Sequence, residues 1–195
     1  MNDSFNSPQL RRIGLSAALL QHRARLDDTG SDGTLMRVTE VQRDALHLHD
    51  GDLEYPARAL PALLQALSQQ GDGLAVGDWV LAERNVHGQW WARQRVPPVT
   101  QIARRLHDGR DKVTRTVIVS NVDTALLVMG LDQDFNARRL ERYLALVRLA
   151  GVSAVVVLTK ADLCVDPAAR LRSVQALLPP DTVAVAVNAL GDEPR

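Results

Sequence analysis

Cysteine is almost absent from this sequence, with Cys164 as the single example. One cysteine excludes an internal disulfide and any zinc site built from several cysteines, and it is typical of a protein of the reducing cytosol. Long apolar runs are missing too: stretches such as residues 154–158 are far too short to span a membrane, and the first residues lack a signal peptide's apolar segment. We therefore expect a cytoplasmic protein with no membrane partner.

Aromatic residues are scarce, at 4%, and the formal net charge is zero. Apolar residues at 46% and charged residues at 24% still describe an ordinary globular protein with an aliphatic core. Zero net charge argues against a strongly cationic nucleic-acid binder, but it hides local clustering. Between residues 93 and 115 basic side chains outnumber Asp108 and Asp111 and make one segment strongly basic: Arg93, Arg95, Arg104, Arg105, Arg110, Lys112 and Arg115.

The first half of the chain has the pattern of a small β barrel. Residues 1–32 contain one helical candidate, 9–22, and are interpreted as an N-terminal arm. Residues 33–97 carry five short strand patterns separated by Gly-Asp and His-Gly turns, which indicates a barrel of the OB-fold kind. These patterns read LMRVTEV, ALHLHD, EYPARAL, WVLAERN and QWWARQRV.

A helical insertion near residues 61–70 interrupts these strands. Pro61 is a suitable first helical residue, and Gly71 a suitable terminator. Leu63, Leu64 and Leu67 would share the buried face.

The second half alternates strands with helices, which indicates a parallel sheet. After a proline-marked basic linker, residues 98–115, the region 116–195 contains two buried strand patterns, TALLVMGL and SAVVVL, and a third strand pattern, TVAVAV. Asn136 and Asp166 are expected N-caps, and Gly151 is an expected helix stop. The intervening helix has an apolar face of Leu140, Tyr143, Leu144 and Val147. Three strands and two helices make half of a doubly wound domain.

The tetrapeptide Thr159-Lys160-Ala161-Asp162 ends the second of these strands. Ligands of open parallel sheets bind at the carboxyl ends of the strands, where Asp162 can accept two parallel hydrogen bonds from a guanine edge. The lysine stem can lie over the base while its ammonium stays in water. A second interpretation needs no ligand: most isolated Thr-Lys-Xaa-Asp sequences are a strand end with a solvated lysine and a helix-capping aspartate.

Taken together, these segments resemble a known family. The stretch VTRTVIVSNVDTALLVMGLDQDFNARRLERYLALVRLAGVSAVVVLTKADLC resembles the start of the circularly permuted GTPase domain of ribosome small subunit-dependent GTPase A (RsgA, also YjeQ or EngC), and VGDWVLAE resembles the OB-fold barrel of that family. The resemblance covers about residues 33–191. It implies an OB-fold barrel followed by a partial α/β domain, an incomplete circularly permuted P-loop GTPase fold.

The resemblance also implies a nucleotide site. Thr159, Lys160 and Asp162 match the family's guanine-specificity motif, with threonine in place of the more usual asparagine. The next strand ends in Asn188-Ala189-Leu190, which stands where the family has a Ser-Ala motif whose backbone supports the base oxygen; asparagine replaces the serine. We therefore expect Thr159, Lys160, Asp162, Asn188, Ala189 and Leu190 to bind guanine nucleotide.

The parts that hold phosphate are not found in the sequence. No segment matches Gly-x-x-x-x-Gly-Lys-Ser/Thr, so we name no catalytic residue and no metal ligand. The resemblance implies GTP or GDP with Mg²⁺ as the complete protein's ligands, and zinc only in a cysteine/histidine module beyond residue 195. We accordingly interpret the chain as the N-terminal portion of such a GTPase, not catalytically competent alone, and expect a monomer.

The barrel and the basic linker have two interpretations. An OB fold beside a basic segment suits RNA, and the resemblance implies small-subunit rRNA as partner, contacted through Arg93, Arg95, Arg104, Arg105, Arg110 and Lys112. Pro98 departs from the arginine common in the family. A solvated linker and core tryptophans are the structural alternative, with Trp79 buried and one of Trp90 and Trp91 exposed because strand neighbours face opposite ways.

Two remaining features are expected to be structural. His47 and His49 would share a strand face, but without a third ligand they are surface residues rather than a metal site. Asn121 and Asp123, in the sequence NVD, are interpreted as a turn at the domain entrance. The leading hypothesis is a GTPase acting in small-subunit maturation. The alternatives are a non-catalytic OB-fold RNA-binding module with a degenerate GTPase remnant, and a scaffold without nucleotide function.

Overall fold

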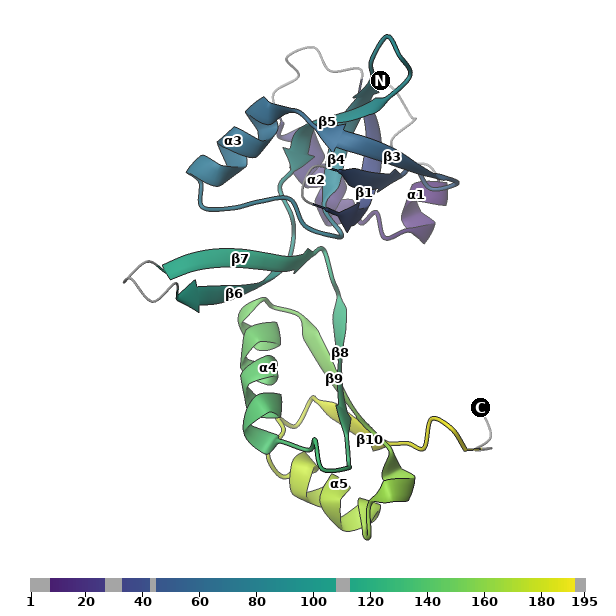
Figure 1. The fold of residues 1–195 in the computed structure, drawn as a ribbon, viewed down its shortest axis with the longest axis vertical. Coiled ribbons are helices and arrows are strands. Elements are labelled where there is room, and N and C mark those ends of the chain that lie inside the picture. The colour runs from purple at the N-terminus through teal and green to yellow at the C-terminus, as the bar shows by residue number, and fades with distance from the viewer. Residues whose placement is uncertain (1–7, 27–32, 43–44, 108–112, 192–195) are drawn as a thin grey trace. The chain divides into compact units, whose positions relative to one another are not determined.

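The computed structural model describes residues 8–26, 33–42, 45–107 and 113–191. The chain divides into two compact units, Met1–Val122 and Asp123–Arg195 (Figure 1). No helix within the described ranges is both long and apolar enough to cross a membrane.

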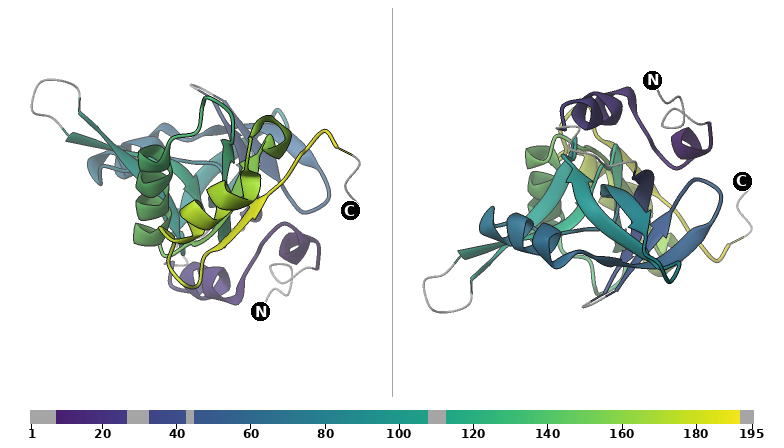
Figure 2. Two further views of the ribbon diagram at one scale, coloured as in Figure 1. Left: turned by 90° about the horizontal axis from the view of Figure 1, so that it is seen from below. Right: turned by 90° about the horizontal axis from the view of Figure 1, so that it is seen from above.

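Five strands of the first unit form a closed barrel (Figure 2). They are β1 (Thr34–Val41), β2 (Leu46–His49), β3 (Glu54–Ala59), β4 (Trp79–Arg84) and β5 (Trp90–Val96). The order is β1-β2-β3-β5-β4, with β4 returning to β1, and only the β3–β5 pair is parallel. This is the expected OB-type barrel, in which closure removes the free sheet edges.

Alternating side chains fill the barrel. Met36, Val38 and Leu48 are almost completely buried, and Trp79 is fully buried as expected. Trp90 and Trp91 are both half-buried, so the prediction that one of them is exposed is wrong. Trp90 is covered because its ring lies against the Tyr55 ring, with centroids 5.9 Å apart, and under the Arg84 guanidinium.

Helix α3 (Pro61–Gln69) connects β3 to β4 and begins at the expected proline. Leu63 and Leu67 pack on the barrel core, whereas Leu64 is 47% exposed, contrary to the expected three-leucine face. Gly71 follows the helix with a φ of +66°, a conformation that favours glycine.

The N-terminal residues form two helices rather than one. Helix α1 (Pro8–Arg12) and helix α2 (Ala17–Ala24) are separated by Gly14, whose φ is +97°, and Ser16 caps the second helix by accepting a hydrogen bond from the backbone N–H of Leu19. These helices pack on the barrel through Leu10, Leu15 and Leu19, which join Trp79 and Val96 in one buried cluster. The segment interpreted as an arm therefore contributes to the core of the first unit.

The predicted linker, residues 98–115, contains strand β6 (Gln101–His107) and the start of β7 (Val113–Ser120), which pair as an antiparallel two-stranded sheet. A Cβ added at Gly77 would lie 2.0 Å from the Ser120 carbonyl oxygen, so only glycine permits this close approach of the barrel to β7. Asn121 completes the junction in a left-handed conformation, donating to the Gly77 carbonyl and accepting from the Val99 N–H. The NVD sequence is thus a structural turn, as expected.

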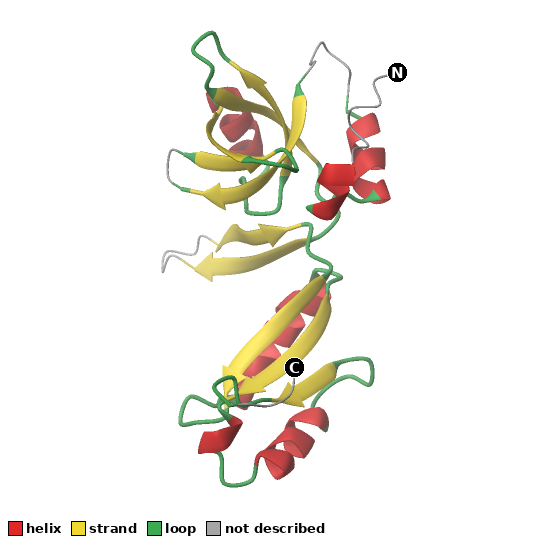
Figure 3. Ribbon diagram, turned by 90° about the vertical axis from the view of Figure 1, so that its right-hand side faces the viewer, coloured by secondary structure: helices red, strands yellow, loops and turns green. Residues whose placement is uncertain are grey.

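The second unit is a parallel sheet in the order β10-β9-β8, with helices in its crossovers (Figure 3). Its elements are β8 (Thr124–Gly130), α4 (Ala137–Leu149), β9 (Ser153–Thr159), the 3₁₀ helix η2 (Ala161–Leu163), α5 (Pro167–Gln175) and β10 (Val183–Ala186). Asn136 and Asp166 cap α4 and α5 as expected, accepting from the backbone N–H groups of Arg139 and Ala169.

The two faces of this sheet differ. Met129, Val156, Leu158 and Ala184 face the helices and are buried with Leu140, Leu144 and Val174. The opposite face is open: Leu126 and Val128 are more than 60% exposed, and Val183 is 58% exposed. The prediction that TALLVMGL is a buried strand is therefore wrong for one face of β8. Tyr143, expected on the buried face of α4, is also exposed, at 46%.

Candidate functional site

Hydrogen bonds bring the carboxyl ends of the three parallel strands together. The Leu131 N–H, just after β8, donates to the Thr159 carbonyl at 2.8 Å. The Val187 N–H, just after β10, donates to the Leu158 carbonyl at 2.8 Å, and the Val187 carbonyl accepts from the Ala161 N–H at 3.2 Å. The TKAD segment therefore lies between the ends of β8 and β10, at the edge where open parallel sheets bind ligands.

Thr159 and Lys160 make the turn out of β9. Thr159 is half-buried, and its hydroxyl lies 3.5 Å from the Met129 carbonyl. Lys160 adopts a left-handed backbone conformation with a φ of +58°, which is uncommon for a residue other than glycine. Such outliers cluster at functional sites, where the surrounding structure maintains them.

The Lys160 ammonium forms an ion pair with the Asp132 carboxylate, two residues after the end of β8. The hydrogen bond from Lys160 holds the pKa of Asp132 below its usual value, and the same bond raises the pKa of Lys160. Asp132 was not singled out by the sequence analysis. The signal that could have found it is its position directly after a predicted strand, at the same sheet edge as TKAD.

Asp162 lies in η2 and is exposed. No described residue forms a hydrogen bond or ion pair with its carboxylate. The helix-capping role that the interpretation without a ligand gives to this aspartate is wrong, because Lys160 occupies the N-cap position of η2 and Asp166 caps α5. Its carboxylate is therefore available to a ligand.

Asn188, Ala189 and Leu190 follow β10 at the same edge. The Asn188 side chain accepts a hydrogen bond from the Leu190 N–H at 3.1 Å, and the Asn188 carbonyl accepts from the Gly191 N–H. Asn188 thus stabilises a local turn. Ala189 and Leu190 are exposed.

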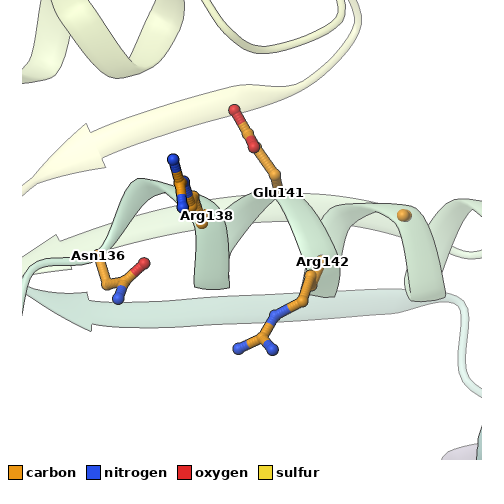
Figure 4. Close-up of a pocket in the computed structure, with 5 residues that line it drawn as sticks. Asn136, Arg138, Glu141 and Arg142 are labelled. Carbon is orange, nitrogen blue, oxygen red and sulfur yellow. The ribbon is translucent and has the colours of Figure 1, made fainter.

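A separate surface depression of about 670 Å³ lies along α4 (Figure 4). Its lining comes from one helix and its cap: Asn136, Arg138, Glu141, Arg142 and Ala145. None of the predicted nucleotide-binding residues lines it.

Comparisons with known proteins found sequences and structures similar to this chain. Residues 100–189 match the family model described as RsgA GTPase. The small ribosomal subunit biogenesis GTPase RsgA 2 of Lactiplantibacillus plantarum is 41% identical over 166 residues, which is 85% of this chain and 45% of the relative. RsgA of Xylella fastidiosa (strain M23) is 36% identical over 161 residues, 81% of this chain and 46% of the relative. These matches support the RsgA family as the family that this chain resembles.

A crystal structure of YloQ, a circularly permuted GTPase, matches 82% of this chain and 54% of the YloQ chain with a TM-score of 0.52. At 16% identity the likeness concerns the fold, an OB-type barrel followed by a partial α/β region of a permuted GTPase. The chain spans less than half the length of the curated RsgA relatives described above.

The arginines predicted to bind RNA occupy different environments in this chain. Arg104 lies on β6 and is exposed. The Arg93 side chain is 47% exposed and pairs with Glu83 at 2.6 Å. The Arg95 side chain is only 8% exposed and donates to Asp72 at 2.7 Å. Arg105 also lies on β6, whereas Arg110 and Lys112 fall outside the described residues.

Arg95 belongs to a buried ionic cluster that the sequence analysis missed. Its guanidinium bonds Asp72 and the Gly73 carbonyl and lies 3.8 Å from Asp78, which is fully buried. Burial raises the pKa of Asp78. Burial also acts to raise the pKa of Asp72, but hydrogen bonds from Arg95 and the Gly73 N–H outweigh it and hold that pKa below its usual value. Arg95 is thus committed to the protein interior and unavailable to phosphate.

The two histidines of β2 are both half-buried. His47 lies 3.0 Å from the Glu40 carboxylate, and the ring of His49 accepts the Gly51 N–H. Across the parts of the chain that the structure describes, no three His, Cys, Asp or Glu side chains are grouped closely enough to hold a metal ion.

Proposed function

We propose that this chain reads the base of a guanine nucleotide with Thr159, Lys160 and Asp162, as the base-recognition part of a GTPase. The observation that carries the proposal is the exposed Asp162 carboxylate, which no described residue engages. It lies three residues after the end of the parallel strand β9, and Lys160 makes the strained turn between them. The names of the RsgA relatives, which describe them as GTPases, support it.

The chemistry of the proposed site separates guanine from adenine. Guanine presents a ring N–H beside an exocyclic amine, and the two oxygens of Asp162 would accept both. Adenine lacks this pair of donors. Each charge-assisted hydrogen bond contributes about 1.5–3 kcal/mol, so the loss of one changes affinity by about tenfold or more. The backbone of Asn188, Ala189 and Leu190 would support the base oxygen from the neighbouring strand end.

The described residues do not fit the phosphate and Mg²⁺ part of a GTPase site. They contain no group of three or more His, Cys, Asp or Glu side chains that could hold a metal ion, and the sequence has no Gly-x-x-x-x-Gly-Lys-Ser/Thr motif. Phosphoryl transfer depends on such phosphate and metal positioning. We therefore assign base recognition to these 195 residues, expect them to hydrolyse GTP negligibly alone, and assign hydrolysis to the complete family architecture.

The proposed partner of the barrel unit is the rRNA of the small ribosomal subunit. The OB-type topology, the exposed Arg104 on β6 and the relatives' description as small ribosomal subunit biogenesis GTPases support this role. Arg95 is left out because its side chain is buried in ion pairs.

Base recognition is tested with GMP, AMP and XMP titrated against the chain and its Asp162→Asn variant. Xanthine carries a carbonyl in place of the exocyclic amine, so the asparagine amide can donate where the aspartate can only accept. We expect the wild type to prefer GMP over AMP and Asp162→Asn to lose about tenfold in GMP affinity while gaining XMP binding. Asp134→Asn, which removes an exposed carboxylate near the site, is the matched control. Equal binding of GMP and AMP by the wild type would disprove base recognition.

The rRNA contact is tested by sedimentation of the chain with small ribosomal subunits over a salt series. Phosphate contacts release counterions, so we expect association to weaken steeply as salt rises. Arg104→Gln should weaken it at every salt concentration, and Arg95→Gln serves as the comparison for a buried arginine. Failure to sediment with subunits even at low salt would count against this partner.

A further inference from the structure

Lys160 is one of only two lysines in the chain, the other being Lys112, although the chain carries 23 Lys and Arg residues in all. A free lysine side chain has several rotatable bonds and loses rotamer entropy when it is ordered. If a protein group holds the lysine in its bound orientation before the nucleotide arrives, less entropy is lost on binding and the nucleotide binds more tightly.

The structure holds Lys160 at both ends. Its backbone has a left-handed φ of +58°, which turns the residue away from the line of β9. Its ammonium bonds Oδ2 of Asp132, while Oδ1 of Asp132 accepts the Asp134 N–H at 3.2 Å. The aspartate that receives the lysine is thus itself fixed by its own loop.

Gly130 makes the space for this pair. It lies opposite Thr159 in the β8–β9 register, and a Cβ added to it would lie 2.6 Å from Oδ1 of Asp132 and 3.4 Å from Cδ of Lys160. The lysine stem therefore passes close over the end of β8 on its way to the carboxylate. Even the Cβ of an alanine at position 130 would be too close to the Asp132 carboxylate unless that side chain moved.

We propose that Asp132 is a positioning residue of the guanine site, holding the Lys160 stem in the orientation that covers the base. The inference rests on the proposed base recognition and adds to it a residue outside the TKAD segment. Asp132 acts through Lys160 and does not itself touch the nucleotide. The raised pKa of Lys160 and the lowered pKa of Asp132 are consistent with the pair.

The test uses the 195-residue chain with ¹³C-labelled lysine, in which Lys112→Arg leaves Lys160 as the only signal. The ammonium pKa of Lys160 and its shift on GMP or AMP addition are measured in wild type, Asp132→Asn, Asp132→Glu and Asp134→Asn. Asp134→Asn is the matched control because it removes a neighbouring exposed carboxylate that does not bond Lys160 and keeps the backbone N–H that Asp132 accepts. Thermal unfolding checks that each variant is folded.

We expect Asp132→Asn to lower the pKa of Lys160 and to weaken GMP binding about twofold to fivefold, the size typical of an exposed charge pair. Asp132→Glu should keep the Lys160 pKa and the GMP affinity close to those of the wild type. Asp134→Asn should change both quantities less than Asp132→Asn does. If wild type prefers GMP but Asp132→Asn binds it equally well, or binds it more weakly with the pKa of Lys160 unchanged, the positioning role is wrong and base recognition stands. If wild type shows no preference for GMP over AMP, base recognition fails and the positioning role fails with it.

Discussion

At the scale of single residues, the barrel unit depends on a buried ionic cluster. Asp72 accepts from Arg95 at 2.7 Å and from the Gly73 N–H at 2.8 Å, and its side chain is 13% exposed. Breaking one member of such a cluster leaves a buried charge with fewer partners, which costs more than an exposed pair does. This explains why an arginine that the sequence analysis assigned to RNA serves stability instead.

Asp72→Asn should lower the free energy of unfolding at pH 7 by about 1.5–3 kcal/mol, the range for hydrogen bonds to charged groups. The folded state holds the pKa of Asp72 below its ordinary 3.8, so this stabilisation is present above that pH and is lost as pH falls through the folded value. The difference between wild type and variant, measured by thermal unfolding across pH, should therefore shrink below about pH 4.

The matched control for Asp72→Asn is Glu83→Gln, which removes the exposed partner of Arg93. We expect that change to cost less than about 1 kcal/mol. Equal effects of the two substitutions, or a pH-independent effect of Asp72→Asn, would contradict the role of the buried cluster.

At the scale of elements, helix α4, which begins at its Asn136 cap, supports the strand ends of the candidate nucleotide site. Asn136 caps its first turn by accepting the Arg139 N–H at 3.0 Å, and Leu140, Leu144 and Val147 are buried on one side of the helix. Leu140 and Leu144 pack in the same cluster as Met129 and Leu158, which immediately precede the residues of the candidate site. The helix thus fixes the strand ends from which Asp132 and Lys160 project.

Asn136→Ala should lower the stability of the second unit by about 1 kcal/mol, whereas Asn136→Asp should retain it because aspartate is an equally good cap. Urea unfolding followed by NMR signals of residues in α4 and β9 measures both. An alanine variant as stable as the wild type would show that the cap contributes nothing here.

At the scale of the whole molecule, each unit has its own core, and the second unit has an uncovered sheet face. Parallel sheets are normally covered on both faces, and exposed apolar patches promote association. Leu126, Val128 and Val183 remain exposed on the face opposite the helices. We expect this exposed apolar sheet face to promote association of the 195-residue chain with itself.

Replacing Leu126 and Val128 together with threonine should reduce concentration-dependent association and dye binding to apolar surface, while preserving the fold because threonine suits strands. Light scattering and fluorescence of an apolar dye measure this. A matched pair, Leu64→Thr and Val86→Thr, changes exposed apolar residues of the barrel unit, at 47% and 97% exposure, and should have little effect. Unchanged association of the sheet variant would show that the open face does not drive it.

The sequence alone determined the barrel strands, the elements of the second unit and the motif, because all of them depend on neighbours in the chain; it missed the break between α1 and α2 and the strand β6. Alternating strand patterns predicted the barrel, and capping residues predicted the starts of α4 and α5. TKAD lies at the strand end where the pattern placed it. Its binding of guanine stays a proposal, and so does the contact of the arginines with RNA.

Only the tertiary structure decided what depends on residues far apart in sequence. Arg95 is an ordinary basic residue in the sequence, and its side chain is buried because the β4–β5 pairing and the segment before β4 bring Asp78 and Asp72 to it. Lys160 meets Asp132, 28 positions earlier, because parallel strands bring their carboxyl ends to one edge. Burial and ion pairing follow from spatial neighbours, which local periodicity does not specify.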